Sequence, residues 1–335
     1  MKKELQPFRQ VKKTIKNQVD KANKDNLTRT AFYERFYKKH PEIRWSLLAG
    51  LVSRNAGWNM TDLANQWFQV LLSEKDRTRL FSIYETGNWT IFDDACPQLL
   101  VYEHSKRVGQ PLFDLLGEFG VSAFMVQEWN RFWLEHDEER LCTALIINEQ
   151  HLLESAVIQK KLFKSIISSK LFFQIEQHTH FSYVLLPTIE GQLYTLYVRQ
   201  FEQVSKRIRL GKQLAYLLFH PDLHQSISFF MDQNPHSGSR RDYFKQMSWS
   251  PRVESACLRL VYPKINHKIE SRVDWYSNHK NISAYFLPIK EWVPVPREKW
   301  VKHKWMMIYM AMTTKKWVTS IVESKSDKQN KPSQK

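Results

Sequence analysis

The chain has 335 residues, 42% of them hydrophobic, which is enough to build a substantial core. Only 9 residues are glycine, well below the usual ~7%, and this favours helices joined by short loops over a sheet with many tight turns. The formal net charge of +16 is unevenly spread. Residues 46–154 hold 8 basic and 16 acidic side chains, whereas residues 1–45 hold 13 and 5, and residues 221–335 hold 20 and 10. We interpret this pattern as partial neutralisation within the molecule, with nucleic acid or an anionic membrane surface as the alternative partner of the basic regions.

The cysteine count and the hydropathy pattern bear on the cellular compartment. Cys96, Cys142 and Cys257 are far apart and form no CxxC pair, which favours reduced thiols. The first residues carry lysines, but no apolar segment of a secretory signal follows them. The longest apolar runs fall far short of the ~20 residues that a membrane span needs. The sequence therefore predicts a cytoplasmic protein without a transmembrane segment.

The N-terminal third reads as three helices. Apolar residues recur every three or four positions over Lys3–Ala22, which predicts a basic amphipathic helix within a first unit, residues 1–25. A second helix is capped at Thr28 and stops before Pro41. The next segment, Glu42–Ala56, is apolar on nearly every side and predicts a buried helix. Gly57 is expected to end that helix, and the following residues are expected to start another.

The rest of the chain predicts further helices and one change of pattern. Two β-prone runs, Tyr183–Leu186 and Leu193–Val198, flank a Glu-Gly turn and predict a hairpin. The fold class expected is mainly α, a multi-helix, bundle-like globular domain with at most a small β-hairpin near 181–198. We expect this domain to cover residues 26–320, with a potential subdivision near 175–200, and a disordered tail over 321–335. The other predicted helices are Arg77–Thr86, Pro97–Val108, Leu112–Glu118, one opened by Ser122, Leu141–Leu171, Phe201–Phe219, Leu223–Asp232, Ser239–Met247, Pro251–Val261 and Lys299–Val318.

A group of polar residues interrupts the most apolar helix. Arg54, Asn55, Asn59 and Asp62 lie around Gly57, and a guanidinium in a core must be paired or it costs several kcal/mol. One interpretation is a structural clamp in which Arg54 pairs with Asp62 across the helix corner. The other is a pocket for an anionic ligand, with Arg54 offering its planar fork and Asn55 its amide.

A second polar cluster is formed by Asn148, Glu149, Gln150 and His151, which sweep a full helical turn between apolar residues, so that at least one is expected to be buried. A hydrogen-bond network between helices explains it simply. Alternatively these residues join the Arg54 pocket, together with Glu103 and His104 as a carboxylate and an imidazole. On that hypothesis the protein is an enzyme or a small-ligand binder built on Arg54, Asn55, Asp62, Asn148 and Glu149.

Motifs for metal, nucleotide and hydrolase chemistry are missing. Pro221 separates the histidines of the pattern His220-x-Asp222-x-His224, and His178 and His180 have the wrong spacing for one helical face. Asp93 and Asp94 are adjacent and are interpreted as helix caps. The sequence contains no GxGxxG, GKS/T, HExxH or GxSxG motif. We therefore predict no cofactor, no metal site and no identified catalytic residue.

The C-terminal third interleaves tryptophans with basic residues, as single-stranded nucleic acid sites and membrane-interface segments both do. The run 237–241, Ser-Gly-Ser-Arg-Arg, also offers a weak phosphate-binding pattern before a predicted helix. The leading hypothesis is a non-enzymatic binding or scaffold protein that uses this surface on nucleic acid or an anionic membrane. Tryptophans packed against the helical body are the simpler alternative. The residues expected to contact a polyanion are Arg240, Arg241, Lys299, Lys302 and Lys304.

Three runs carry a resemblance to a known family: HPEIRWSLLAGLVSRNAGWNMTDL, INEQHLLESAVI and SPRVESACLRLVYPK. With them, the chain resembles the uncharacterised YppC-like family of bacilli over roughly Asn26 to Trp317. The resemblance implies a bacterial cytosolic protein. Because that family is a domain of unknown function, it implies no activity, ligand or catalytic residue.

Overall fold

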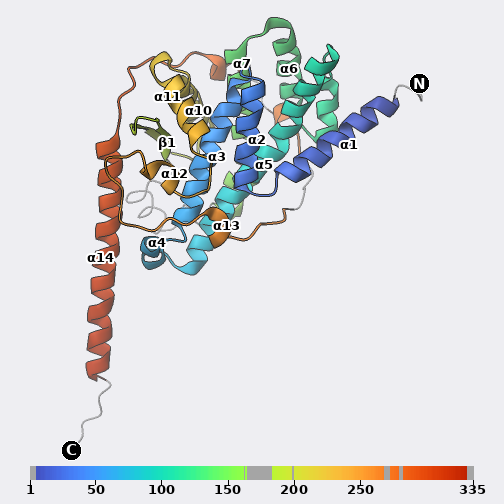
Figure 1. The fold of residues 1–335 in the computed structure, drawn as a ribbon. Helices are drawn as coiled ribbons and strands as arrows, with labels where there is room; N and C mark the ends of the chain where they lie inside the picture. Colours follow the sequence, from blue (N-terminus) through green and yellow to red (C-terminus); the bar gives the residue numbers. More distant parts are fainter. Residues whose placement is uncertain are drawn as a thin grey trace, which may run out of the picture.

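A computed structural model describes residues 5–161, 163, 183–197, 200–267, 272–278 and 282–329. Within these residues the protein is mainly helical and contains one two-stranded antiparallel sheet, so the predicted fold class is confirmed (Figure 1). In the described part of the chain, no helix has both the length and the hydrophobicity needed to cross a membrane.

The first half of the chain forms the core of the helical body. Several predicted starts are confirmed by their caps: Ser73 and Ser122 each accept a hydrogen bond from the first turn of the helix that follows. Thr28 takes part in a capping box, but the cap itself is Asp25. The elements are α1 (Leu5–Ala22), α2 (Asn26–Lys39), α3 (Arg44–Asp62), α4 (Gln66–Leu71), α5 (Glu74–Val108), the 3-10 helix η1 (Phe113–Phe119), α6 (Ala123–Glu135), α7 (Glu138–Leu153) and the π-helical turn η2 (Glu154–Ile158).

The second half adds a hairpin and shorter helices to that body. The predicted hairpin is confirmed as β1 and β2, with Leu185 opposite Thr195 at its centre. Two predicted helices shrink to single turns, α12 and α13, because the chain there is held by loop contacts. The elements are β1 (Tyr183–Pro187), β2 (Leu193–Tyr197), α10 (Val204–Leu218), α11 (Pro221–Gln233), α12 (Arg241–Phe244), α13 (Leu258–Val261), the 3-10 helices η3 (Trp275–Asn278) and η4 (Ser283–Phe286), and α14 (Glu298–Gln329).

The central helix α3 is longer than the sequence predicted. It runs unbroken through Gly57, which we had expected to end it. Gly57 is needed for packing: a Cβ atom there would lie 2.4 Å from Asn26 Oδ1 and 2.5 Å from His236 Nε2. The glycine therefore permits a close approach inside a continuous helix, and the predicted helix corner does not exist.

Helix α5 joins two predicted helices into one of 35 residues. Gly87 and Pro97, expected as its boundaries, both lie inside it and are buried. Asp93 and Asp94, expected as caps, are interior residues of the same helix. Burial against α1, α3 and α7 outweighs the cost of about 3 kcal/mol that an interior proline imposes.

Helix α14 departs most from the expectation for the C-terminal region. It was predicted as Lys299–Val318 followed by a disordered tail from residue 321, yet it spans 32 residues and continues to Gln329. Its first half packs against α4, and its second half extends beyond the body (Figure 1). The expected first unit, residues 1–25, ends close to the C-terminus of α1. The potential subdivision near 175–200 falls partly outside the described residues.

Candidate functional site

The structure gives Arg54 different partners from those expected. Its guanidinium is buried and donates from Nε to Glu34 Oε1 at 2.5 Å. Two backbone carbonyls of α11 and its C-terminal end, those of Met231 and Asn234, accept from its terminal nitrogens at 2.8 and 2.5 Å. Because α3 is continuous, Asp62 lies eight residues, about 12 Å, further along the helix axis. The predicted Arg54–Asp62 pair is therefore wrong, although Arg54 does act as a clamp, between α2, α3 and α11.

Asp62 pairs instead with Arg240, which was expected to contact a polyanion. Arg240 Nε donates to Asp62 Oδ2 at 2.7 Å, and both side chains are buried. The same guanidinium also donates to Asn59 Oδ1 at 2.8 Å and to the hydroxyl of Tyr243 at 2.9 Å. Burial raises the pKa of Asp62 to about 6, although Arg240 opposes the shift. Arg240 is thus a core residue and is not exposed to a polyanion.

Asn55 is committed to the hairpin. Its amide nitrogen donates to the carbonyl of Leu185 at 2.8 Å, and its amide oxygen accepts from the Leu185 backbone N–H at 2.8 Å. The side chain therefore satisfies both backbone groups of one residue of β1, as a neighbouring strand would. This role anchors the sheet to α3 and leaves no free amide for a ligand.

The second polar cluster forms a separate network between α5, α6 and α7. Asn148 donates to Asp94 Oδ2 at 2.7 Å and accepts from the Ser122 hydroxyl and the Trp275 indole, each at 2.9 Å. Gln98 also donates to Asp94 Oδ2, at 2.6 Å. Burial raises the pKa of Asp94 to about 7. The simpler explanation, a hydrogen-bond network between helices, describes Asn148 well.

The remaining members of the predicted pocket lie elsewhere. Glu149 accepts from the Trp45 indole at 3.0 Å, near the start of α3, and Gln150 accepts from Arg207 Nε of α10 at 3.1 Å. Glu103 lies 3.5 Å from Lys39 on the outer side of α5, and His104 contacts Arg107. None of these residues approaches Arg54, whose network is closed by Glu34 and α11.

The expected pocket is therefore not assembled. Arg54, Asn55, Asp62, Asn148 and Glu149 belong to five separate hydrogen-bonded groups, and none lines the cavities of about 630, 560 and 420 Å³. The reason is that each of these side chains, all from α3 or α7, faces a different neighbouring segment. Their polarity stabilises the packing of helices and does not form a site.

In the predicted phosphate-binding run, residues 237–241, backbone N–H groups already have hydrogen-bond partners within the protein. The backbone N–H of Ser237 donates to Asp242 Oδ2 at 3.1 Å, and the N–H of Arg240 donates to the Ser255 hydroxyl at 2.9 Å. A carboxylate thus occupies the position proposed for a phosphate. Arg241 is exposed at the first turn of α12, a helix of only four residues.

The histidine patterns form no metal site in the described residues. His220 caps α11 by accepting from the Asp222 backbone N–H at 3.3 Å, while His224 bonds the Leu218 carbonyl at 3.1 Å. His178 and His180 lie outside the described residues. Within the described part of the chain, no group of three or more His, Cys, Asp or Glu side chains is placed to hold a metal ion.

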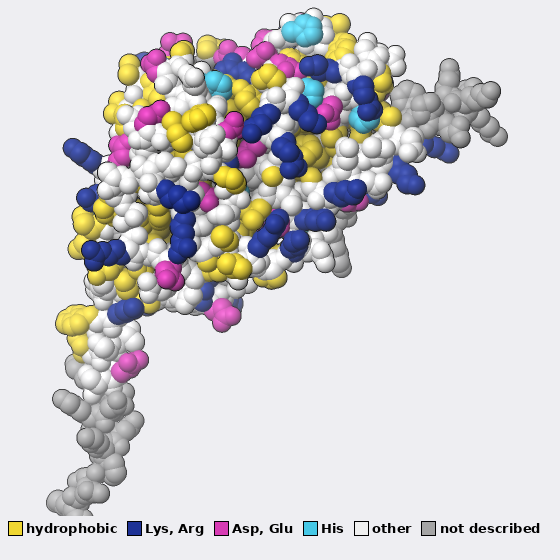
Figure 2. Space-filling model, viewed as in Figure 1, with side chains coloured by type: hydrophobic (Ala, Val, Ile, Leu, Met, Phe, Trp, Pro, Cys, Tyr) yellow, Lys and Arg dark blue, Asp and Glu magenta, His cyan; other side chains and the backbone are white. Residues whose placement is uncertain are grey.

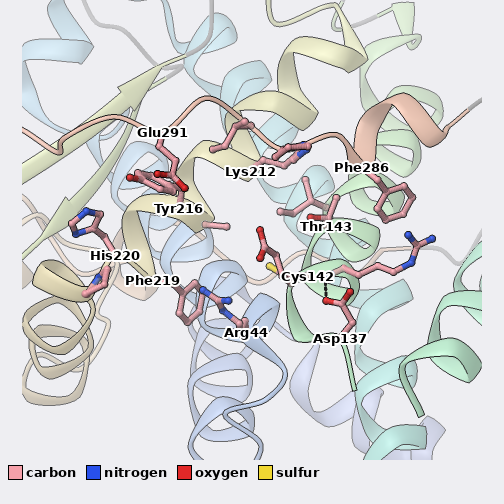
Figure 3. Close-up of a pocket in the computed structure, with 17 residues that line it drawn as sticks. Arg44, Asp137, Cys142, Thr143, Lys212, Tyr216, Phe219, His220, Phe286 and Glu291 are labelled. Atoms are coloured by element: carbon pink, nitrogen blue, oxygen red, sulfur yellow. Dashed lines mark hydrogen bonds between the residues drawn. The ribbon is translucent and has the colours of Figure 1, made fainter. Parts of the chain in front are cut away.

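A cavity of about 630 Å³ opens between four segments that the sequence did not connect (Figure 3). These are the start of α3, the first half of α7, the second half of α10 with the start of α11, and the extended segment 286–291. Charged and aromatic side chains surround its open centre in Figure 3. The residues that matter below are Arg44, Glu139, Arg140, Cys142, Lys212, Phe219 and Glu291.

The cavity contains a cysteine whose thiol is not activated. Cys142 is buried, and burial raises the pKa of its thiol to about 12. The thiol is therefore neutral near pH 7, and only the thiolate attacks or binds metals efficiently.

The basic C-terminal surface keeps only part of its expected composition. Trp305 is buried against Trp67, Trp300 stacks on Tyr197, and Trp292 packs on Tyr216. Lys299 and Lys302 are exposed on the first turns of α14, and Lys304 is partly covered with its ammonium over the Trp300 ring.

Exposed apolar side chains on α14 were not identified from the sequence. Met306 and Met310 are about half exposed and Trp317 is 65% exposed. Their spacing of four and seven residues places the three on one side of the helix. Val301, Trp305, Ile308 and Met312 occupy the opposite side, which is buried on the body. Figure 2 shows hydrophobic and basic side chains side by side where α14 leaves the body.

Comparison with known proteins agrees with the resemblance seen in the sequence. The chain is 43% identical over 320 residues to the uncharacterized protein YppC of Bacillus subtilis (strain 168), covering 94% of this chain and 98% of that protein. No solved structure matches the chain. A family model described as a protein of unknown function, DUF2515, matches residues 21–287. The chain therefore belongs to the DUF2515 family of proteins of unknown function.

Proposed function

We propose that this protein is a non-enzymatic binding protein that attaches peripherally to an anionic membrane surface through α14. The observation that carries the proposal is the solvent-facing stripe of Met306, Met310 and Trp317 on a helix that extends beyond the body. Apolar side chains with flanking lysines are what an interfacial helix inserts at the boundary of headgroups and acyl chains.

The charge of the C-terminal region supports an anionic surface. Lys302 and Lys316 are exposed along one edge of the stripe, and Lys299 lies at its N-terminal end. Residues 315–335 hold six lysines and only two acidic residues. Each basic residue near an anionic bilayer contributes about 1 kcal/mol of attraction.

A membrane is favoured over nucleic acid because of which side chains are exposed. Stacking of successive bases needs a series of accessible aromatic rings. Of the four tryptophans between residues 292 and 317, Trp292, Trp300 and Trp305 pack against the body, and Trp317 offers an open face. The exposed methionines suit acyl chains and have no use on a phosphate backbone.

Sedimentation with vesicles tests the proposal. We expect the full-length protein to bind phosphatidylglycerol–phosphatidylcholine vesicles and to bind pure phosphatidylcholine much less. Raising the salt from about 0.1 M to about 1 M shortens the Debye length from about 10 Å to about 3 Å and should weaken binding strongly. The double substitution Met310→Ser, Trp317→Ser should weaken it roughly tenfold or more, because two apolar side chains lose their burial in lipid.

The matched control is Leu134→Ser, since Leu134 is 80% exposed on α6, away from α14. This substitution should leave vesicle binding unchanged. Equal loss in both variants would contradict the proposal, as would the absence of binding to anionic vesicles at low salt. Binding to single-stranded DNA that is tighter than binding to vesicles and insensitive to Met310→Ser would favour nucleic acid instead.

A further inference from the structure

One wall of the cavity between α3, α7, α10 and segment 286–291 is held in place by hydrogen bonds. Lys212 of α10 donates from Nζ to the carbonyl of Tyr285 at 2.7 Å and also to that of Leu287. At the other end of the segment, the Tyr216 hydroxyl donates to the Trp292 carbonyl at 3.0 Å. Two residues of α10 thus fix both ends of segment 286–291. The cavity volume of about 630 Å³ lies within the range of small-molecule sites.

One arginine of the cavity is part of its wall. Arg140 forms a bidentate pair with Glu128, with both N···O distances 2.8 Å, and its guanidinium lies 4.1 Å over the Phe286 ring. Its donors are used within the protein. Lys212 is likewise used on carbonyl oxygens. Neither cation is available to dominate the binding of a ligand.

Arg44 is different. Its guanidinium lies 4.1 Å from the centroid of the Phe219 ring, which fixes the plane of its fork. In the part of the chain that the structure describes, no carboxylate oxygen lies within 4.0 Å of Arg44, and its side chain makes no hydrogen bond. A guanidinium whose orientation is fixed and whose N–H groups have no partner can bind a carboxylate or a phosphate. Figure 3 shows Arg44 and Phe219 together at one wall of the cavity.

Two carboxylates face the same space, and Glu139 acts electrostatically on Lys212 without a close ion pair. Glu139 and Glu291 line the cavity, and neither forms an ion pair with a described residue. Burial raises the pKa of the Cys142 thiol, Arg44 acts to lower it, and Glu149 and Glu139 act to raise it, so charges of both signs lie near that residue. The cavity therefore separates an open cation from open carboxylates.

From this arrangement we propose that the cavity binds a small zwitterion, a free amino acid or a peptide of two or three residues. The ligand's carboxylate pairs with Arg44, and its ammonium pairs with Glu139 or Glu291. Its apolar part contacts Phe219 and Ile146. This inference is independent of the membrane proposal, because the site and α14 share no residue.

Isothermal titration calorimetry on the full-length protein tests the inference with three probes: phenylalanine, alanyl-phenylalanine and alanyl-alanyl-phenylalanine. The length that binds tightest distinguishes a free amino acid from a peptide. N-acetylation and C-amidation of that probe should each weaken binding about tenfold or more, since each removes one charged contact worth at least about 1.4 kcal/mol.

Substitutions then locate the two contacts. Arg44→Gln should weaken binding of the unmodified probe about tenfold but should not weaken the amidated probe further, because the contact is already lost. Glu139→Gln should behave in the same way toward the N-acetylated probe, unless Glu291→Gln does so in its place. The control is Arg131→Gln, which removes an exposed arginine that pairs with Glu135 on α6, outside the cavity.

Three outcomes would overturn the inference. The first is no heat of binding for any probe at millimolar concentration. The second is an affinity that survives either amidation or acetylation, which would leave a ligand with a single charge. The third is equal loss in Arg44→Gln and Arg131→Gln. Circular dichroism melts of each variant show that a lost affinity is not a lost fold.

Discussion

The helical body and the outer half of α14 differ in which side chains they bury and which they expose. In the body, buried arginines have carboxylate partners: Arg29 pairs with Glu85 at 2.5 Å, and Arg240 pairs with Asp62 at 2.7 Å. On the outer half of α14, Trp317 and Val322 are 65% and 61% exposed. The charges of these two pairs are matched inside the body, whereas α14 leaves apolar groups uncovered. The uncovered groups of α14 are the ones that we propose to meet a membrane.

The largest effect should come from breaking a buried ion pair. Asp62→Ala leaves the Arg240 guanidinium buried without its carboxylate, and we expect the free energy of unfolding to fall by about 3–5 kcal/mol. Chemical denaturation measures the loss. The double variant Asp62→Ala, Arg240→Met removes both charges and should recover part of it. A loss below about 1 kcal/mol in the single variant would show that the pair is not shielded from water.

A smaller effect is expected at the centre of α3. Gly57→Ala places a methyl group 2.4 Å from Asn26 Oδ1 and 2.5 Å from His236 Nε2. We expect a loss of about 1–3 kcal/mol, despite the higher helix propensity of alanine. Gly87→Ala is the matched control, because its new atom would lie 3.4 Å from Leu153, an ordinary contact. There the propensity gain of up to about 1 kcal/mol should show. The close approach at Gly57 would be refuted by equal thermal stability of the two variants.

The third prediction concerns pH. Burial raises the pKa of Glu149 to about 7 from 4.5, so the folded state holds the proton more tightly than the unfolded chain. Its stabilising contribution is fully present below about pH 4.5 and is lost as pH rises through about 7. Glu149→Gln keeps an acceptor for the Trp45 indole but does not titrate. The variant should therefore gain stability relative to the wild type by up to about 1.4 kcal/mol per pH unit over this window.

Denaturation of the wild type and of Glu149→Gln at about pH 5, 6 and 7 measures this difference. A gap between the two proteins that stays constant over these pH values would mean that Glu149 titrates normally in the folded state. A gap that narrows as the pH rises would reverse the sign and place a cation beside Glu149.

The smallest effect on stability should come from the outer half of α14. Val322→Ala changes an exposed side chain and should alter the free energy of unfolding by less than about 0.5 kcal/mol. Ile308→Ala, on the buried side of the same helix, should cost about 2–5 kcal/mol. Thermal melts of the two variants compare the outer half of α14 with the half that packs on the body. A large loss in Val322→Ala would mean that α14 is covered in solution, by a second copy for example.

Local signals in the sequence were sufficient for the fold class and for several boundaries. The pattern of apolar residues gave α1, α10 and the hairpin, because helical and strand periodicity are properties of the segment itself. The caps Ser73 and Ser122 were readable for the same reason, since each bonds a backbone N–H within its own first turn. The burial of Arg54 followed from its apolar neighbours.

Tertiary structure decided which side chains form ion pairs and whether a glycine or proline ends a helix. Gly57 and Pro97 are terminators by local propensity, but packing places both inside continuous helices. The sequence indicates that Arg54 must pair with a carboxylate, but its partner Glu34 lies on another helix. Asp62 pairs with Arg240, which is distant from it in the sequence. The cavity around Arg44 is assembled from four segments that are distant in the sequence. The spacing of residues within any one segment therefore could not predict it. Long-range pairing depends on how whole helices pack, and that is a property of the complete fold.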